Sequence, residues 1–205
     1  CTSLLRLIRV KKRKKKIVVW TETCPHYFIY NSDDFLNNAP YLKVIPPVRH
    51  RFEAMGLVAA VANGEIDIIS TDHCAVNPDV QEQGWNNVWN ADNGIGSIDV
   101  YFSILLHLSR LRILSLPQIA KLTAEHPARL FGLKDRGMIM PGKRAHIVIA
   151  DLKKERCVED TASPYNGMAF MGSVDCTIVH GRIVMEDGRI KTRRLGRFVP
   201  GNWVS

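Results

Sequence analysis

The side chains best suited to chemistry are Asp72 and His73, which come at the end of a short apolar run. The run, residues 64–70, is rich in isoleucine, and β-branched residues of this kind are typical of a strand covered on both faces. A carboxylate at the C-terminal end of a parallel strand can bind a divalent metal and shuttle a proton. An aspartate that only stabilises a turn is the competing interpretation, and the strand context taken alone favours it.

The residues before Asp72 predict a parallel α/β unit. Residues 17–20 form an apolar run that we expect to be a buried strand, and Pro25 interrupts the loop that follows it. Residues 49–63 carry apolar side chains at helical spacing, and the helix should end at Asn63-Gly64. The order strand, loop, helix, strand is that of a (β/α) barrel, in which metals and substrates bind at the C-terminal ends of the strands.

The residues after Asp72 predict a change of architecture near residue 137. A polar loop over 77–93 is long enough to suggest a function. Ser115 and Gln118 form a capping-box pattern that opens a helix. Residues 145–151 and the two sides of His180-Gly181 then predict strands, the second pair as a hairpin. We therefore expect an α/β part followed by an all-β part.

The net charge of +8 comes from one end of the chain. Residues 1–16 hold eight of the 28 Lys and Arg and no acid, which leaves 20 basic and 20 acidic side chains elsewhere. We interpret this segment as a truncated junction, with a phosphate-binding arm or nuclear-import signal as the alternatives. Binding to nucleic acid is therefore not expected.

The five cysteines are widely spaced and include no Cys-x-x-Cys pair. This pattern predicts neither a disulfide framework nor a cysteine zinc knuckle, and it favours a reducing, cytoplasmic setting. No apolar stretch reaches the roughly 20 residues of a membrane span, so no membrane partner is expected. The chain does not begin with Met, and we interpret it as a fragment.

Seven segments, in this order, resemble the cyclic amidohydrolases: hydantoinase, dihydropyrimidinase, allantoinase and dihydroorotase. Each segment is weak alone, but together they extend over most of the chain and favour the metal-binding interpretation of Asp72. They are ETCPHY (22–27), KVIPPVR (43–49), TDHC (71–74), NGIGSI (93–98), HPARLFGL (126–133), the stretch 136–149, and SPYNGM (163–168).

The resemblance implies a metal-dependent (β/α)8 barrel joined to a small β-sandwich. Residues 17–136 would be the C-terminal part of the barrel, and 137–205 the sandwich portion and tail. The family takes most metal ligands from earlier strands, including a His-x-His pair that none of the seven histidines here forms. We therefore expect this chain to be inactive by itself.

The resemblance also assigns roles to residues. It implies two divalent ions, with zinc as the expected metal, and Asp72 as ligand of one ion and as the proton carrier between water and the leaving nitrogen. Ile45, His73, Asn93 and Gly94 would contact the substrate. A packed His73 and a Gly94 that only permits a tight turn are the competing interpretations. His26 lies outside the implied ligand set and is interpreted as structural.

Within the family, the residues favour a hydantoinase or dihydropyrimidinase that opens a small cyclic amide. Cys74, Asn93-Gly94, the segment 163–168 and the ending 196–200 resemble that branch. Val76 and Ile45 replace residues typical of dihydroorotase, whereas the segment 22–27 keeps allantoinase as an alternative. A non-catalytic scaffold on the same fold is a hypothesis of another class. The resemblance also implies that the whole protein forms a homo-oligomer.

Overall fold

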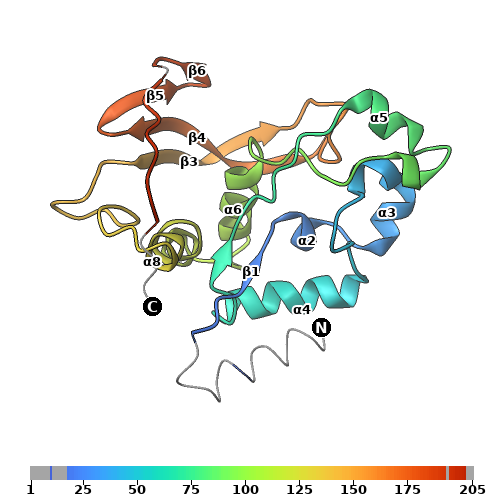
Figure 1. The fold of residues 1–205 in the computed structure, drawn as a ribbon, viewed down its shortest axis with the longest axis horizontal. Helices are drawn as coiled ribbons and strands as arrows, with labels where there is room; N and C mark the ends of the chain where they lie inside the picture. The colour runs from blue at the N-terminus through green and yellow to red at the C-terminus, as the bar shows by residue number, and fades with distance from the viewer. Residues whose placement is uncertain (1–9, 11–17, 193, 202–205) are drawn as a thin grey trace. The chain divides into compact units, whose positions relative to one another are not determined.

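The computed structural model describes residue 10 and residues 18–192 and 194–201 of the chain (Figure 1). It divides into two compact units. The first unit extends to Tyr101 and includes Val158–Met168, and the second comprises Phe102–Cys157 and the chain from Ala169 onward. The basic segment predicted at residues 1–16 lies outside the described residues, apart from Val10.

Two short parallel strands position the candidate site in the first unit. β1 (Glu22–Thr23) pairs with β2 (Ile68–Ile69), with Glu22 opposite Ile68. The predicted parallel arrangement is therefore confirmed, but β1 begins later than the predicted strand at 17–20. Residues 18–20 are not in a strand, and the Val18 side chain is 80% exposed.

Hydrogen bonds of Thr21 explain where the pairing begins. The Thr21 backbone N–H donates to the Asp67 carboxylate (2.8 Å), and the Thr21 hydroxyl donates to the same oxygen (2.8 Å). The Thr21 carbonyl accepts from the backbone N–H groups of Asp67 and Ile68, both at 3.0 Å. These long-range bonds set the register from Thr21 onward, although the preceding valines have the stronger β propensity.

Helices connect β1 to β2. The chain forms α2 (His26–Ile29), α3 (Ser32–Asn38), the 3₁₀ turn η1 (Ala39–Leu42) and α4 (Arg51–Ala62). The last of these confirms the helix predicted over 49–63, and it packs against α2. It ends at Ala62, directly before the predicted Asn63-Gly64, and the φ of +72° at Gly64 suits glycine.

The long loop after β2 is partly helical. It contains α5 (Pro78–Gln83) and the 3₁₀ turn η2 (Val88–Asn90). The fully buried Gln81 side chain holds the loop together, because its Nε2 donates to the Pro40 carbonyl (2.6 Å) and its Oε1 accepts from the Asp92 N–H (2.9 Å). The loop is therefore a packed element with its own buried polar contacts.

The segment Val158–Met168 completes the first unit. The Tyr30 hydroxyl donates to the Pro164 carbonyl (2.7 Å), and the rings of Tyr30 and Tyr165 lie 5.4 Å apart. Both tyrosines are buried, and burial is the main cause that raises their pKa values. A segment distant in sequence is thus anchored beside the end of α2.

The helical part of the second unit follows the predicted signals. It comprises α6 (Tyr101–Arg110), α7 (Leu116–Ala120), the π turn η3 (Lys121–Glu125) and α8 (His126–Leu130). Ser115 and Gln118 form the expected capping box before α7. Leu105 and Ile104 of α6 are almost completely buried and contribute to the core of this unit.

A four-stranded antiparallel sheet forms the remainder of the second unit (Figure 1). Its strands are β3 (Ile147–Cys157), β4 (Ala169–Val179), β5 (Arg182–Glu186) and β6 (Arg189–Ile190), paired in that order. The predicted hairpin at His180-Gly181 is confirmed, and both turn residues have positive φ (+52° and +75°), as a two-residue turn of this kind requires. Among the described residues after 137, the regular elements are therefore all strands.

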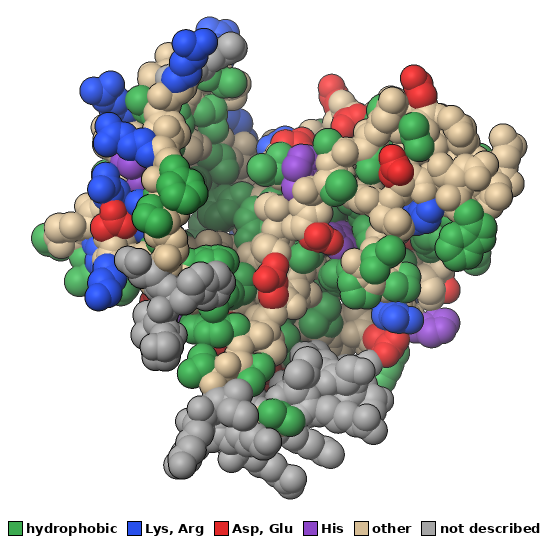
Figure 2. Space-filling view, in the orientation of Figure 1, with side chains coloured by type: hydrophobic (Ala, Val, Ile, Leu, Met, Phe, Trp, Pro, Cys, Tyr) green, Lys and Arg blue, Asp and Glu red, His purple; other side chains and the backbone are tan. Residues whose placement is uncertain are grey.

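Basic side chains gather over β5 and β6, at the upper left of Figure 2. Part of this charge is paired with acids, since Lys191 Nζ lies 3.2 Å from Glu186 Oε2. On the neighbouring strands, Lys154 Nζ lies 3.1 Å from Asp175 Oδ1. This agrees with the balanced charge of residues 17–205. Among the described residues, no helix has both the length and the apolar character that crossing a bilayer requires.

Candidate active site

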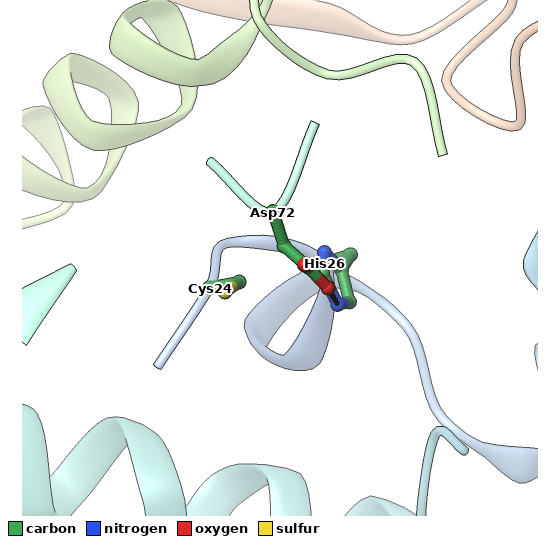
Figure 3. Close-up of side chains that lie close together, drawn as sticks. All are labelled: Cys24, His26 and Asp72. Carbon is green, nitrogen blue, oxygen red and sulfur yellow. Dashed lines mark ion pairs between the residues drawn. The ribbon is translucent and has the colours of Figure 1, made fainter. Parts of the chain in front are cut away.

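Asp72 lies in the loop that leaves the C-terminal end of β2, where the sequence predicted a functional carboxylate. Its φ of +47° is in the left-handed region, which aspartate tolerates better than most non-glycine residues. The side chain is 52% exposed. Figure 3 shows it pointing toward His26. The Asp72 carboxylate is therefore in contact with His26 on one side and accessible to solvent on the other.

Cys24, which directly follows β1, and His26, which begins α2, lie beside Asp72. His26 Nε2 lies 3.8 Å from Asp72 Oδ2, and the His26 side chain is completely buried. Ligand atoms of all three side chains lie within 4.8 Å of one another. Neither His26 ring nitrogen has a hydrogen-bond partner among the described residues. The parallel pairing of β1 and β2 brings these residues together, because their C-terminal ends share one edge.

The position of His26 beside Asp72 adds to the sequence-based interpretation of this residue as structural. The residue is buried, as a packing role requires, but it also lies directly beside the predicted metal ligand. The sequence analysis did not consider Cys24 as part of the site. The signal that could have found both was their position just after a strand that was predicted to be parallel to the one preceding Asp72.

Burial keeps both new members of the cluster neutral at pH 7. It raises the pKa of the Cys24 thiol to about 11, although the contact between Cys24 Sγ and Ser70 Oγ (3.4 Å) opposes this. Burial also lowers the pKa of His26 to about 4, against the attraction of the Asp72 carboxylate. A neutral imidazole keeps a free nitrogen lone pair, which is the form that binds metals.

The low pKa of His26 makes the stability of the metal-free chain depend on pH. The unfolded state gains a proton near pH 6.5 and the folded state only near pH 4, so the free energy of unfolding falls as pH is lowered between these values. We expect a loss of about 2 kcal/mol between pH 7 and pH 5 from this group. Urea unfolding in the presence of a chelator measures it.

The histidine contribution can be isolated by substitution. His26→Gln should remove most of the change in the free energy of unfolding between pH 7 and pH 5. The same substitution at the exposed His50 should leave that change as it is in the wild type. If the free energy of unfolding changed equally with pH in the wild-type and His26→Gln chains, His26 would not be buried as a neutral ring.

His73 connects the loop after β2 to the backbone of Ser97 and Ile98 by hydrogen bonds. Its Nδ1 accepts hydrogen bonds from the backbone N–H groups of Ser97 (3.0 Å) and Ile98 (3.2 Å). An Nδ1 that accepts leaves the proton of the neutral ring on Nε2. The Ser97 hydroxyl strengthens the junction by donating to the Thr71 carbonyl (2.8 Å). Sequence reasoning missed Ser97, whose side chain is buried.

Asn93 and Gly94 belong to the same junction. The Cys74 N–H donates to the Ile95 carbonyl (3.0 Å), and the Gly94 N–H donates to the Lys43 carbonyl (2.9 Å). Gly94 has a φ of +155°, and a Cβ there would lie 2.7 Å from Cys74 Cβ. Glycine is therefore required for the contact with Cys74. Asn93 itself is exposed.

The predicted substrate residues therefore lie on segments that are hydrogen-bonded to one another. Ile45 lies two residues after Lys43, whose carbonyl binds Gly94, and its side chain is 73% exposed. His73 adjoins both Asp72 and the strand-like bridge to Ile95. The segments that carry Ile45, Asp72-His73 and Asn93-Gly94 are thus joined by hydrogen bonds, as a shared site requires.

Comparisons with known proteins show which family this chain resembles. The sequence profile described as the amidohydrolase family matches residues 52–185. A dihydroorotase of Lactobacillus acidophilus is 30% identical over 193 residues, which cover 90% of this chain and 44% of that protein. An L-hydantoinase of Paenarthrobacter aurescens is 32% identical over 192 residues, which cover 88% of this chain and 42% of that protein.

The fold is similar to that of a solved L-hydantoinase (dihydropyrimidinase) from Arthrobacter aurescens. The TM-score is 0.87 at 28% identity, and the match covers 93% of this chain and 44% of that one. The chain thus spans less than half the length of the relatives it matches. Since the family profile matches most of the sequence, the chain belongs to the amidohydrolase family.

Proposed function

We propose that the whole protein opens a hydantoin or dihydropyrimidine ring by hydrolysing its cyclic amide bond. The observation that carries this proposal is the half-exposed Asp72 carboxylate at the end of β2, in a loop joined to Asn93-Gly94 and Ile45. Relatives named as hydrolases of cyclic amides support it. The 205-residue chain itself should be inactive, because most ligands implied by the resemblance lie elsewhere.

The proposal includes an architecture. Residues 17–136 would be the C-terminal part of a (β/α)8 barrel, and residues 137–205 part of a β-sandwich. The parallel pair β1 and β2 with α4 between them in sequence supports the first assignment, and the antiparallel sheet of β3 to β6 supports the second. The whole protein would assemble as a homo-oligomer.

Amidohydrolases generally bind divalent metals, and the donors in this chain suit zinc. The Asp72 carboxylate is a ligand type that Zn²⁺ accepts, and its exposed side chain can reach an ion. In our proposal Asp72 holds the metal. When bound, the metal lowers the pKa of a water and polarises the amide carbonyl.

The residues of this chain would handle the proton and the substrate. Asp72 would take a proton from the attacking water and deliver it to the leaving ring nitrogen. His73 has Nδ1 occupied by backbone N–H groups, so its Nε2–H is the atom available to donate to a substrate oxygen. The exposed amide of Asn93 and the backbone near Ile45 and Gly94 would complete the contacts.

The choice of substrate rests on individual residues. Val76 and Ile45 stand where the resemblance implies different side chains for dihydroorotase, so a hydantoin or dihydropyrimidine is favoured. A dihydroorotase-like activity is the second candidate, because the Lactobacillus acidophilus relative carries that name. The segment 22–27 also resembles allantoinase, and a non-catalytic scaffold on the same fold would open none of these rings.

A substrate panel tests the proposal. The protein expressed with its upstream coding sequence should open hydantoin or dihydrouracil faster than dihydroorotate or allantoin, and a chelator should stop the reaction. Product formation followed by chromatography gives the rates, with the 205-residue chain as the inactive control. A protein that opens none of the four rings with added zinc, manganese or cobalt would be a scaffold instead.

A further inference from the structure

We infer that Cys24, His26 and Asp72 form a binding site for a single divalent ion of the zinc class, which this chain can fill without the rest of the protein. The site goes beyond the proposed function, although the two share Asp72. Two of its three ligands, Cys24 just after β1 and His26 at the start of α2, lie outside the ligand set that the resemblance implies.

The spacing of the donor atoms suits such an ion. In a tetrahedral zinc site with bonds of about 2.0–2.1 Å, nitrogen and oxygen ligands lie about 3.3 Å apart. His26 Nε2 and Asp72 Oδ2 are 3.8 Å apart, and the three ligand atoms lie within 4.8 Å of one another. Closing around an ion therefore needs movements of about half an ångström to one ångström. Figure 3 shows Asp72 facing His26, with Cys24 on the segment that leads into α2.

The state of His26 is the second, independent observation. Its ring is completely buried, and neither nitrogen has a hydrogen-bond partner among the described residues. Most buried polar atoms are satisfied, so an unpartnered Nε2 that faces a carboxylate 3.8 Å away needs an explanation. An ion bound at Nε2 would provide a partner for that nitrogen.

The charges of the three ligands match that of a divalent ion. On binding, the Cys24 thiol would release its proton to solvent and form a sulfur–metal bond. The thiolate and the Asp72 carboxylate then carry two negative charges that match a divalent cation, with His26 neutral. Ser70 Oγ lies 3.4 Å from Cys24 Sγ and donates its own proton to the Glu22 carboxylate, so it accepts from the neutral thiol of the metal-free chain.

The donor set also defines the class of ion. Thiolate and imidazole ligands favour Zn²⁺, Co²⁺ and Cd²⁺ over Mg²⁺ and Ca²⁺, which prefer oxygen. The exposed edge of Asp72 leaves room for water as a fourth ligand. We therefore expect one tetrahedral ion per chain.

Cobalt titration of the metal-free 205-residue chain tests the site. We expect the visible absorption of tetrahedral Co²⁺ together with a sulfur-to-cobalt charge-transfer band, both lost when Zn²⁺ displaces the cobalt. Cys24→Ser should abolish the charge-transfer band, and His26→Gln should weaken binding about tenfold or more. The matched control is Cys74→Ser, which removes an exposed thiol two residues from Asp72 and should keep the band.

A measurement on the unaltered chain avoids dependence on the variants. Zn²⁺ should slow alkylation of Cys24 but not of Cys74, as read by mass spectrometry of the labelled peptides. A wild-type chain without the band, a band that survives Cys24→Ser, or equal protection of both thiols would overturn the site. Ring opening by the whole protein is judged separately, because its assignment does not use Cys24.

Discussion

Replacing Asp72 by asparagine in the whole protein should lower kcat for ring opening by about 10³-fold or more, without unfolding the protein. The side chain keeps its size, and asparagine also tolerates the positive φ of this position. What it loses is the ability to accept a proton, and a positioned acid–base group typically contributes about 10² to 10⁴ in rate. Loss of the negative ligand should weaken metal binding as well.

The matched control is Asp92→Asn, which changes an exposed carboxylate next to Asn93 that has no assigned role. It should retain the wild-type kcat. Steady-state rates at saturating substrate, with metal content and thermal unfolding measured on each variant, separate a catalytic defect from misfolding. Wild-type turnover by a folded Asp72→Asn protein would remove this residue from the mechanism.

The elements that sequence reasoning predicted well depend on neighbours in the chain. The capping box of Ser115 and Gln118 spans four residues, and the turn at His180-Gly181 needs only its own backbone conformation. The helix α4 and its end before Gly64 follow from local periodicity and from one glycine. Such signals are complete within a short window, so they do not depend on the rest of the fold.

The start of β1 could not be predicted in this way. Residues 18–20 have the stronger β propensity, yet the pairing begins at Thr21 because Asp67, 46 residues later, binds it. Propensity contains no information on such a partner. A contact of long sequence separation therefore decided the position of the strand.

The candidate site shows the same division. The sequence predicted that Asp72 follows a strand, since the isoleucine run precedes it directly. That Cys24 and His26 meet Asp72 follows from the register of β1 on β2, which no local pattern specifies. Gly94 was predicted to contact the substrate, and its close approach to Cys74 is known only from the structure.

Gly172→Ala should be strongly destabilising, lowering the free energy of unfolding of the second unit by about 3 kcal/mol. This glycine of β4 has a φ of +111°, and a Cβ there would lie 2.4 Å from Leu106 Cβ on α6. Because Leu106 Cβ is attached to the helix backbone, a rotation of the side chain cannot relieve the overlap. Overpacking costs about 1–3 kcal/mol, and a left-handed conformation adds about 1–2 kcal/mol.

Two further glycines separate these causes. Gly188→Ala keeps the positive φ (+73°) but meets open space, so it should cost about 1–2 kcal/mol from backbone strain alone. Gly196→Ala meets no neighbouring atom within 4 Å and should change stability little. Urea unfolding followed by far-ultraviolet circular dichroism gives all three values. If Gly172→Ala cost no more than Gly188→Ala, α6 and β4 would not approach as closely as the glycine implies, and the packing of the sheet on this helix would have to be revised.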